Sequence, residues 1–539
     1  MKDISSTGSF IDFTLENFIY VDKTEYIPKL VKLKRVFISR PRRFGKSLTL
    51  DTIATLFETG VEPYFKGTWI YDKWTEPTYP VLRLNFLNFD KNSLEKFNNK
   101  LNSKITEFAE LNHVTSYKEK EEAEDSIDHL LEQLRLENRQ IVILIDEYDC
   151  QMTANINNET LYKQFQEKIK SFYATIKNKW PIKFLGITGV TRLKDVEIFS
   201  IGSDIRDITN ASAYSQMIGF TRDEIKKYYI DYLKLAASYE NNCAVDEITD
   251  DKLESMFDKL EEQYGGYCFD EDYEKKVFNT WSVNDFFQSV VSNKFVYFGE
   301  YWYDNGGVPK ILSDFVKNNE QELFDCILKG KFISVPTSDL KFPPSLISIN
   351  PKVLMCQTGY LTLCSNLKYF EMLLGVPNSE IYKALSRLLA NNIFKGNTDI
   401  TDDYGRSLLE VGTVDDIINL FNSALNSVSY DNYPIVSESS VQNMLKLYLL
   451  GAHQKVLSEV HEAKGRADLV VNTDNRRIVF EFKYAKNETE AKSKLLDAVE
   501  QIKTRDYGNI VPKKTELLRI ATVFNADPKV RAFTEFQLV

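Results

Sequence analysis

The chain has 539 residues and a formal net charge of −11, and it is too long for one ordinary domain, so we expect two to four. No run approaches the roughly 18 uninterrupted apolar residues of a membrane helix, and the first residues lack the apolar stretch of a signal peptide. The six cysteines are scattered without a metal-like CxxC pair, and the four histidines are not paired at ligand spacing. These features predict a reduced, cytoplasmic protein without a membrane partner, and they disfavour His-based zinc chemistry.

The acidic balance at first disfavours nucleic acid as a partner, but charge is not uniform along the chain. Eight basic residues and no acidic residue lie between Lys29 and Lys46, and from Gly451 onward Lys and Arg slightly outnumber Asp and Glu. Local charge governs contact with phosphates more than the global sum does. Solvated faces on an acidic protein are the alternative interpretation for any single lysine.

The first third of the chain alternates between strand-like and helix-like segments. A long charged segment at about 91–137 has helical character and lies between the second and third strand candidates. The third candidate is continuously apolar, as is typical of a strand buried on both faces. The strand candidates are residues 35–39, 81–86, 141–145 and 183–188. This alternation predicts an α/β fold with a parallel sheet.

A phosphate-binding loop is expected between the first strand and the helical run that starts at about Leu48. The run Arg43-Phe44-Gly45-Lys46-Ser47 fits the end of a P-loop, although Arg40 stands where the first glycine belongs. Backbone N–H groups at the helix start would hold the phosphates of ATP. Lys46 would reach the β- and γ-phosphates, and the Ser47 hydroxyl would ligate Mg²⁺. The Gly-Lys-Ser tripeptide alone is weak, because it occurs by chance in many chains.

Two acidic residues strengthen this interpretation. Asp146 and Glu147 directly follow the apolar third strand, where Asp146 would hold the metal and Glu147 would polarise the attacking water. Thr188, at the end of the fourth strand, could sense the γ-phosphate, and Arg192 could contact nucleotide or be an ordinary surface arginine. A capped helix and an acidic strand end without any ligand are the structural alternative.

The pattern of predicted secondary structure changes near residue 220. Thr221 and Glu224 stand at capping-box spacing, and helical segments dominate from there to about 430, with a short β-like run near 361–363. A polar stretch at 429–434, ending in proline, indicates a boundary. We therefore expect an ATPase-like P-loop domain over 1–220, a mostly helical lid or linking region over 221–430, and a smaller α/β domain over 431–539.

The last domain is predicted to run in the order helix, three strands, helix, strand. A turn at 472–475 would join the second and third strands. The expected helices cover about 438–450 and 489–506, and the expected strands cover 455–460, 467–471, 478–484 and 517–524.

Three charged residues on the strands at 467–471 and 478–484 predict a metal-dependent nuclease site. Side chains alternate faces along a strand, so Glu481 and Lys483 share one face with Val479, and Asp468 can lie across the hairpin from them. Two carboxylates can hold a divalent metal, and a nearby lysine can orient or activate water for attack on a phosphodiester. An amphipathic hairpin with its charges in water is the plain alternative.

Flanking residues make the site more coherent. Glu459 on the preceding strand and Glu438 at the start of the preceding helix could each add a metal ligand. The following helix carries Gln501, with Tyr507 just after it.

Several motifs in order give the chain a family resemblance. They are Arg40-Pro41-Arg42-Arg43-Phe44-Gly45-Lys46-Ser47, Ile187-Thr188-Gly189-Val190, Gly219-Phe220-Thr221, Gln357-Thr358-Gly359-Tyr360-Leu361-Thr362, and Gly465-Arg466-Ala467-Asp468 with Glu481-Phe482-Lys483. Over nearly its whole length the chain resembles bacterial proteins that join an AAA-ATPase-like domain to a PD-(D/E)XK nuclease domain. The resemblance implies a restriction-endonuclease-like core at the C-terminus, and it makes Arg-Pro-Arg-Arg the expected form of the loop.

The sequence thus favours an ATP-binding regulator joined to a magnesium-dependent nuclease that cleaves DNA or RNA, with the helical middle relaying nucleotide state. Two alternatives stay open: an ATP-gated nucleic-acid-binding module whose nuclease fold does not cut, and a nucleotide-switched signalling ATPase with a protein partner. If Arg192 acts across subunits, the protein would form a homo-oligomer.

Overall fold

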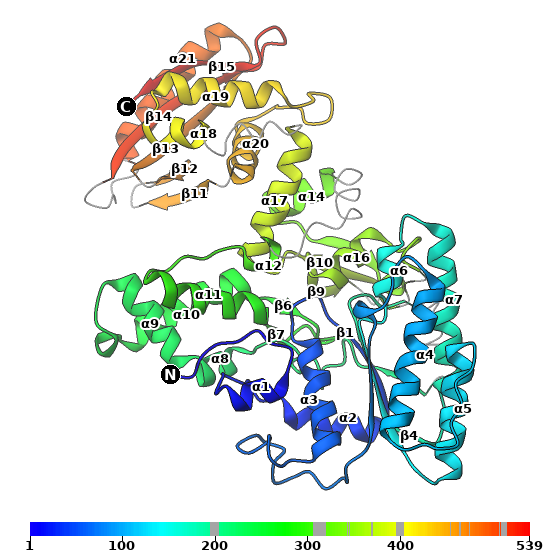
Figure 1. Ribbon diagram of the computed structural model, residues 1–539. Coiled ribbons are helices and arrows are strands. Elements are labelled where there is room, and N and C mark those ends of the chain that lie inside the picture. The colour runs from blue at the N-terminus through cyan, green and yellow to red at the C-terminus, as the bar shows by residue number, and fades with distance from the viewer. Residues whose placement is uncertain are drawn as a thin grey trace. The chain divides into compact units, whose positions relative to one another are not determined.

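The computed structural model describes residues 1–193, 204–304, 320–341, 343, 345–367, 370–394, 404–452, 454–462, 465–473, 475–505, 507 and 515–539 (Figure 1). The chain divides into two compact units. Unit 1 comprises Met1–Gly307 with Phe332–Ile381, and unit 2 comprises Val308–Lys331 with Tyr382–Val539. The domain limits expected at residues 220 and 430 stay predictions.

A five-stranded parallel sheet forms the centre of unit 1. Its order is β2-β3-β4-β1-β5, and every neighbouring pair runs parallel. The four predicted strands are confirmed, and the very short β5 is an addition that no apolar run indicated. The strands are β1 (Arg35–Ser39), β2 (Val81–Asn85), β3 (Ile141–Asp146), β4 (Ile182–Gly189) and β5 (Arg206–Asp207). All six residues of β3 are buried, as its continuous apolar sequence predicts.

Amphipathic helices accompany this sheet. The charged segment predicted as helical at 91–137 forms two helices, α4 (Leu94–Leu111) and α5 (Ala123–Leu136), which Figure 1 shows beside α7 (Glu159–Ile176). Apolar residues on one face of α4, among them Leu101, Ile105 and Phe108, are buried, and Ser93 caps its first turn. The remaining helices here are α1 (Phe10–Leu15), α2 (Ile27–Leu33), α3 (Lys46–Thr59) and α6 (Cys150–Ala154).

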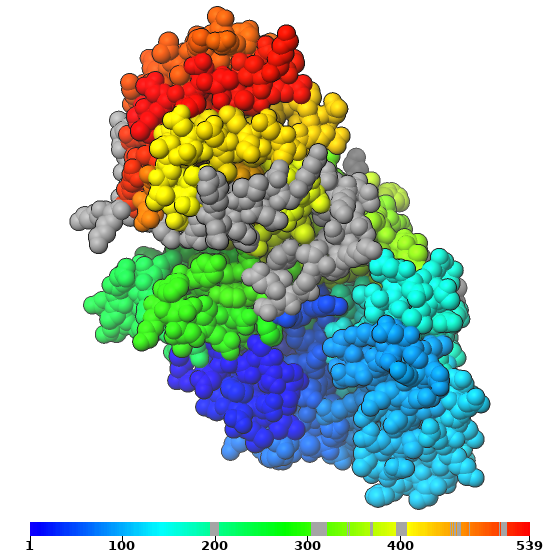
Figure 2. All heavy atoms as spheres, turned by 45° about the horizontal axis from the view of Figure 1, so that its top comes forward, coloured from blue at the N-terminus to red at the C-terminus, as the bar shows by residue number. Residues whose placement is uncertain are grey.

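A second core in unit 1 joins the N-terminal residues to a group of helices that we call the lid. The lid consists of α8 (Arg222–Tyr228), α9 (Ile230–Asn241), α10 (Asp250–Tyr264) and α11 (Thr280–Asn293). Ile4, Ile19 and Val21 pack into its apolar core, and Figure 2 shows the N-terminal residues in blue against the green lid. The predicted capping box is present: Glu224 N donates to Thr221 Oγ1, and Thr221 N donates to Glu224 Oε2.

The middle of the chain is mostly helical but also contains β structure. A hairpin pairs β6 (Tyr267–Cys268) with β7 (Lys276–Val277), and a three-stranded antiparallel sheet has the order β8-β10-β9. The β-like run near 361–363 lies at the start of β9. The sheet is formed by β8 (Ile333–Pro336), β9 (Thr362–Leu367) and β10 (Glu371–Gly375), and the helices around it are α12 (Tyr301–Asp304), α15 (Thr337–Lys341) and α16 (Pro351–Thr358).

Unit 2 contains a mixed five-stranded sheet of order β11-β12-β13-β14-β15. Only β13 and β14 are parallel, and α21 connects them, as a parallel pair requires. The strands are β11 (Lys455–Glu462), β12 (Gly465–Asn472), β13 (Arg476–Ala485), β14 (Glu516–Asn525) and β15 (Ala532–Leu538). The helices are α14 (Glu320–Lys329), α17 (Ser379–Ile393, which belongs to this unit from Tyr382 onward), α18 (Tyr404–Val411), α19 (Val414–Asn426), α20 (Glu438–Gly451) and α21 (Glu488–Arg505). The predicted order of helix, three strands, helix and strand is confirmed, with β15 in addition.

Helices cover both faces of this sheet. Val479 packs with Ala498 and Ile502 of α21, whereas Phe480 lies against Phe421 of α19. The face that carries Glu481 is therefore covered by protein, which contradicts the alternative of an amphipathic hairpin with its charges in water. Among the described residues, no helix is long and apolar enough to cross a membrane.

Candidate functional site

The loop between β1 and α3 has the backbone shape of a phosphate-binding turn. Arg43 has a φ of 66° and Gly45 a φ of 100°, so both residues adopt left-handed backbone. A Cβ at Gly45 would meet no heavy atom within 4 Å, which means that the backbone conformation, and not crowding, favours glycine here. The loop ends at the first turn of α3, where backbone N–H groups have no partner within the helix.

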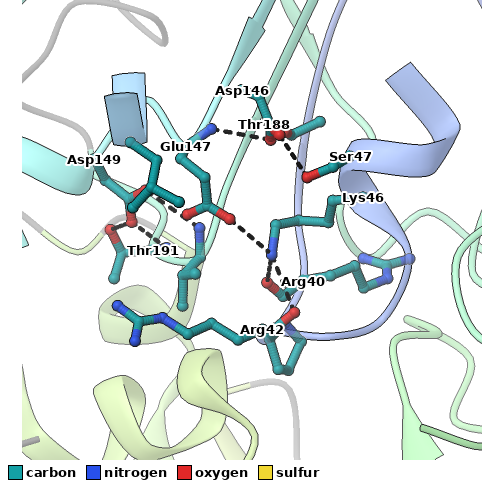
Figure 3. A network of polar contacts seen from close by, with 12 residues as sticks. Arg40, Arg42, Lys46, Ser47, Asp146, Glu147, Asp149, Thr188 and Thr191 are labelled. Carbon is teal, nitrogen blue, oxygen red and sulfur yellow. Dashed lines mark hydrogen bonds and ion pairs between the residues drawn. The ribbon is translucent and has the colours of Figure 1, made fainter. Parts of the chain in front are cut away.

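Five of the predicted nucleotide-site residues converge beside this loop (Figure 3). Lys46 is 4% exposed, and its Nζ donates to the carbonyl oxygens of Arg40 and Pro41, both at 3.1 Å. The same Nζ lies 3.6 Å from Glu147 Oε1. The lysine is therefore held by groups that a phosphate oxygen could replace.

The Asp146 carboxylate, at the end of β3, is hydrogen-bonded to both α3 and β4. Ser47 Oγ, at the start of α3, donates to Asp146 Oδ2 at 2.6 Å, and Thr188 Oγ1, near the end of β4, donates to Asp146 Oδ1 at 2.5 Å. These groups meet because the carboxyl ends of parallel strands lie at the same edge of a sheet. A serine hydroxyl and a carboxylate oxygen are the ligands that a P-loop site uses for Mg²⁺. The residues present thus fit the metal that the fold implies.

Glu147 is held in an unusual backbone conformation, with a φ of 53°. Burial raises the pKa of its carboxyl above the usual value, the positive charge of Lys46 opposes that shift, and the carboxylates of Asp149 and Asp146 add to it. A carboxylate with a raised pKa near the phosphate loop is suited to accept a proton from water.

The next two residues, Tyr148 and Asp149, clamp the loop that follows β4, and sequence reasoning missed them. Asp149 is 1% exposed, and its Oδ2 accepts from Thr191 N at 2.7 Å and from Thr191 Oγ1 at 2.5 Å. Its Oδ1 accepts from Val190 N at 3.3 Å. The sequence signal was limited to Asp149, a third acidic residue close after β3.

Tyr148 completes the clamp. Its hydroxyl donates to Thr191 O at 3.1 Å and accepts from Leu193 N at 3.1 Å. The ring lies so close to Gly189 that a Cβ there would be 2.4 Å from Tyr148 Cδ1. Residues 148 and 149 thus fix the position of the chain immediately after Thr188.

Arg40, which replaces the first P-loop glycine, turns its side chain away from the phosphate loop. It is 1% exposed, its Nη1 donates to Ser39 O at 2.9 Å and Thr209 O at 2.6 Å, and its guanidinium carbon lies 4.2 Å from the centre of the Phe269 ring. Burial lowers the pKa of Arg40 to about 9, while the charge of Asp207 opposes that shift. Only the carbonyl of Arg40 faces Lys46.

The lid contacts the phosphate loop at Arg43, and the β6–β7 hairpin contacts it at Phe44. The Arg43 guanidinium lies 4.1 Å from the centre of the Trp281 ring, and Thr280 Oγ1 donates to Arg43 O at 3.0 Å. The Phe44 side chain is buried and meets Tyr267 edge-on at 4.8 Å between ring centres. Only the backbone of Phe44 can therefore contact a phosphate.

Arg192 lies elsewhere. Its Nε forms an ion pair with Asp207, and its backbone N donates to the Gln357 side chain at 3.2 Å. It does not line the cavity beside the phosphate loop. Its assignment as a nucleotide contact stays a prediction.

A cavity of about 340 Å³ opens beside the phosphate loop. Its walls include Lys46 and Ser47 together with Tyr20 from the N-terminal segment, Gly219 from the segment before the lid, and Trp281 from α11. Sequence reasoning did not place Tyr20 or Trp281 in the site, because no local pattern links residues so far apart in the chain. Gly219 belonged to a motif that carried the family resemblance but had no assigned role.

The second candidate site lies on β12 and β13 of unit 2. Pairing of Leu469 with Phe480 places Asp468 beside Glu481, and Asp468 Oδ2 accepts a hydrogen bond from Phe482 N at 2.9 Å. Lys483 Nζ donates to Glu481 Oε1 at 2.9 Å. The structure thus brings the three predicted residues together.

Glu481 is 1% exposed, and its second carboxylate oxygen, Oε2, has no hydrogen-bond partner in the described part of the chain. Burial raises the pKa of Glu481 to about 7, the charge of Asp468 adds to this shift, and the hydrogen bond from Lys483 opposes it. A buried carboxylate oxygen without a partner is costly unless a cation binds it. The residues present fit a divalent metal held by Asp468 and Glu481.

Lys483 is a cation among carboxylates. Burial alone would lower the pKa of its amine, but the hydrogen bond to Glu481 and the nearby charge of Glu438 raise it above the usual value. Glu438 Oε2, from the first turn of α20, lies 3.8 Å from Lys483 Nζ. Glu438 thus reaches the site through Lys483.

The other flanking residues differ in their placement. Gln501 Nε2 and Arg505 Nη1 donate to the hydroxyl of buried Tyr507 at 3.2 and 3.0 Å. Glu459 belongs to β11, but its side chain lies outside the described residues. Among the residues that the structure describes, no group of three or more His, Cys, Asp or Glu side chains could hold a metal.

Fold and sites together define a domain with a P-loop ATPase fold, followed by an α/β domain in which Asp468, the buried Glu481 and Lys483 lie together. Residues 5–199 match a family model described as a predicted AAA-ATPase, and residues 436–533 match the model of the PD-(D/E)XK nuclease superfamily. The chain therefore joins an AAA-ATPase-like domain to a domain of the PD-(D/E)XK nuclease superfamily, as its motifs predicted.

A similar protein is the uncharacterized protein in the vnfD 5′ region of Azotobacter chroococcum mcd 1. It is 25% identical over 533 residues, which cover 95% of this chain and 94% of that protein.

Solved structures with partial similarity include Cdc6p from Pyrobaculum aerophilum, with 12% identity, a TM-score of 0.22, and coverage of 68% of this chain and 93% of that one. The ORC2 protein of Aeropyrum pernix has 11% identity, a TM-score of 0.25, and coverage of 69% and 92%. The ORC1 protein of the same organism, solved in complex with DNA, has 10% identity, a TM-score of 0.26, and coverage of 72% and 97%. TM-scores this low support no inference about the present chain.

Proposed function

We propose that unit 1 binds and hydrolyses ATP with Mg²⁺, and that the PD-(D/E)XK domain cleaves nucleic-acid phosphodiester bonds with Mg²⁺. The observation that carries the proposal is the pair of polar clusters: Asp146 bonded to both Ser47 and Thr188, and the buried Glu481 bonded to Lys483 beside Asp468. Each cluster supplies metal ligands next to a group that can act on water or phosphate.

At the nucleotide site, Ser47 and Asp146 would hold the metal, which neutralises charge on the phosphates. Lys46 exchanges its two carbonyl partners for phosphate oxygens when ATP binds. Glu147, with its raised pKa, takes a proton from the attacking water, and Thr188 keeps Asp146 in position. The clamp formed by Tyr148 and Asp149 holds the chain after Thr188 still during turnover.

At the nuclease site, Asp468 and Glu481 would hold the metal, which lowers the pKa of bound water and polarises the phosphate. The raised pKa of Lys483 keeps its amine protonated near neutral pH, so the lysine orients the attacking water and stabilises negative charge on the phosphate. Asp468 also accepts from Phe482 N, which fixes its carboxylate relative to β13.

Cleavage by the full-length chain tests the nuclease assignment. Labelled DNA and RNA, single- and double-stranded, are incubated with Mg²⁺ or with EDTA. We expect Asp468→Asn, Glu481→Gln and Lys483→Met each to slow cleavage by about 100-fold or more. Lys492→Met, which removes an exposed lysine on α21, is the matched control and should cleave at the wild-type rate.

Equal cleavage by the wild type and the three site variants would contradict the assignment. Metal-dependent binding without any product would instead support the alternative of a nucleic-acid-binding module with an inactive nuclease fold. Repeating the assay with ATP, with ADP and without nucleotide tests whether nucleotide state regulates the output.

Steady-state ATP hydrolysis tests the other site. Glu147→Gln should bind ATP with nearly wild-type affinity and hydrolyse it about 100-fold more slowly, whereas Lys46→Ala should lose binding. Glu159→Gln, an exposed carboxylate on α7, is the control. Wild-type turnover by Glu147→Gln would remove Glu147 from the mechanism.

A further inference from the structure

Unit 2 contains a cavity that neither proposed reaction uses. Its volume is about 170 Å³, and it lies between the segment after α19 and the loop that follows β14. The walls are mainly apolar and aromatic, with one cation. The residues that matter here are Leu425, Tyr430, Tyr433, Ile435, Phe524 and Arg531.

The cation, Arg531, has an incomplete set of partners. Its guanidinium carbon lies 3.3 Å from the centre of the Tyr430 ring, so the planar group stacks on the tyrosine. Its Nε is buried without a hydrogen-bond acceptor, and no carboxylate pairs with the guanidinium in the described part of the chain. A desolvated donor without an acceptor is unfavourable, so the site is prepared for an anion that is absent from the protein itself.

The rest of the cavity suits a flat apolar ring. Tyr430 is 42% exposed at the mouth, whereas Tyr433 is 9% exposed and Phe524 is 2% exposed in the walls. Tyr433 is itself supported by the Phe324 ring at 5.9 Å between centres. A cation next to an aromatic wall matches a nucleotide, in which a negatively charged phosphate and a flat base lie close together.

The cavity lies at the end of the sheet where β14 finishes and where β13, the strand that carries Glu481 and Lys483, also finishes. β13 and β14 are parallel, with Lys483 opposite Val523 and Tyr484 opposite Phe524. Val523 is the residue of β14 that lies opposite Lys483, and Phe524 follows it one residue, or about 3.3 Å, further along the strand. Side chains alternate faces, so Lys483 and Phe524 lie on opposite faces but close to a common edge. A nucleic-acid chain crossing that edge would reach both.

We infer that this cavity binds one unpaired nucleotide of the nucleic-acid substrate, with a phosphate on Arg531 and the base against the aromatic walls. A base inside a duplex is not available to such a cavity, because it must leave its stack first. The inference rests on the proposed function for the class of substrate, and it adds that the substrate is single-stranded or carries a displaced base.

Binding in EDTA isolates this site from cleavage. The full-length chain is titrated into a labelled single-stranded thymidine oligonucleotide of about 12 nucleotides and, separately, into a duplex, and fluorescence anisotropy gives the dissociation constants. The main variant is Arg531→Asn, because Arg531 has a φ of 43° and asparagine tolerates left-handed backbone. Lys529→Ala removes a nearby exposed positive charge and is the matched control.

We expect Arg531→Asn to weaken single-strand binding by about tenfold or more and Lys529→Ala by about twofold or less. An oligonucleotide with abasic sites should bind the wild type about tenfold more weakly than the thymidine strand does. Arg531→Lys keeps the charge and should be intermediate. Thermal unfolding confirms that each variant is folded.

Equal binding by Arg531→Asn and the wild type, or equal losses in Arg531→Asn and Lys529→Ala, would overturn the inference. So would equal affinity for the abasic and thymidine strands, or preference for the duplex. The outcome is separable from the nuclease assignment: Arg531-dependent binding without metal-dependent cleavage would retain this site and reject the nuclease. Cleavage that depends on Glu481 but not on Arg531 would do the reverse.

Discussion

Replacing Asp149 tests whether the clamp after β4 positions the nucleotide site. In Asp149→Asn the remaining oxygen can still accept from Thr191, but the amide nitrogen then faces Val190 N, a second donor. The hydrogen bond from Val190 N is lost, and the two hydrogen bonds from Thr191 become weaker because their acceptor is no longer charged. Hydrogen bonds to a charged group contribute about 1.5–3 kcal/mol each, and the bond from Val190 N is long. We expect the free energy of unfolding of unit 1 to fall by about 2 kcal/mol.

Asp149→Ala should be more damaging and should lower the free energy of unfolding of unit 1 by about 4 kcal/mol in total, because two buried backbone N–H groups then have no acceptor. The chain has two units and will not unfold in one step, so stability is best read from hydrogen exchange of β3 and β4. The same variants should lower the rate of ATP hydrolysis by about tenfold or more, because a small displacement of Thr188 misplaces Asp146.

Asp128→Asn is the control, since Asp128 is 52% exposed and pairs with Lys179 on the surface. It should change the free energy of unfolding by less than about 0.5 kcal/mol and leave hydrolysis unaltered. If Asp149→Asn and Asp128→Asn prove equally stable and equally active, the clamp does not position the site and the reasoning is wrong.

Three further predictions concern single groups in unit 1. Thr188→Val keeps the shape of the side chain but removes the hydrogen-bond donor to Asp146. The rate constant for ATP hydrolysis should therefore fall about tenfold, while KM changes by less than about threefold. A change in KM alone would contradict this prediction. Gly219→Ala should destabilise unit 1 by about 1–3 kcal/mol, because φ is 105° and the new Cβ would lie 2.7 Å from a valine methyl, whereas Gly8→Ala, with nothing within 4 Å, should melt like the wild type. Burial raises the pKa of Cys356 to about 12, so at pH 8 only about 10⁻⁴ of the thiol is ionised. Mass spectrometry should show that Cys356 is alkylated far more slowly in the native chain than in urea. Equal alkylation rates in the two conditions would contradict the raised pKa of the thiol.

The parts of the fold that the sequence predicted are those encoded by local patterns. Strands β1, β3 and β4 are mainly apolar runs of strand length, β2 alternates buried leucines with the exposed Arg83, and the parallel arrangement follows from the helices between the strands. Once the strands are parallel, Lys46 and Asp146 must lie at the same end of the sheet, so the meeting of these two motifs, a hundred residues apart, was predictable from the sequence. The Glu481 and Lys483 pair followed from alternation along one strand.

The parts that were missed depend on long-range packing. β5 has two residues and β15 is only partly buried, so neither gives a clear apolar pattern. Trp281 reaches the phosphate loop only because the lid folds over Arg43, and no local signal records that. The alternative of charges in water failed for Glu481 because α21 covers its face of the sheet, which a strand pattern alone does not reveal.

Arg40 has a consequence for anyone who engineers this chain toward the common form of its motif. Restoring the missing glycine would look like a repair, yet it would withdraw a guanidinium whose bonds reach the carbonyls of Ser39 and Thr209 and whose flat face rests on Phe269. The turn would lose these side-chain contacts, and residue 40, whose carbonyl oxygen accepts a hydrogen bond from Lys46, would be held less firmly. In this chain the P-loop backbone is supported by a buried arginine side chain, and we expect that Arg40→Gly would disturb the conformation of the loop.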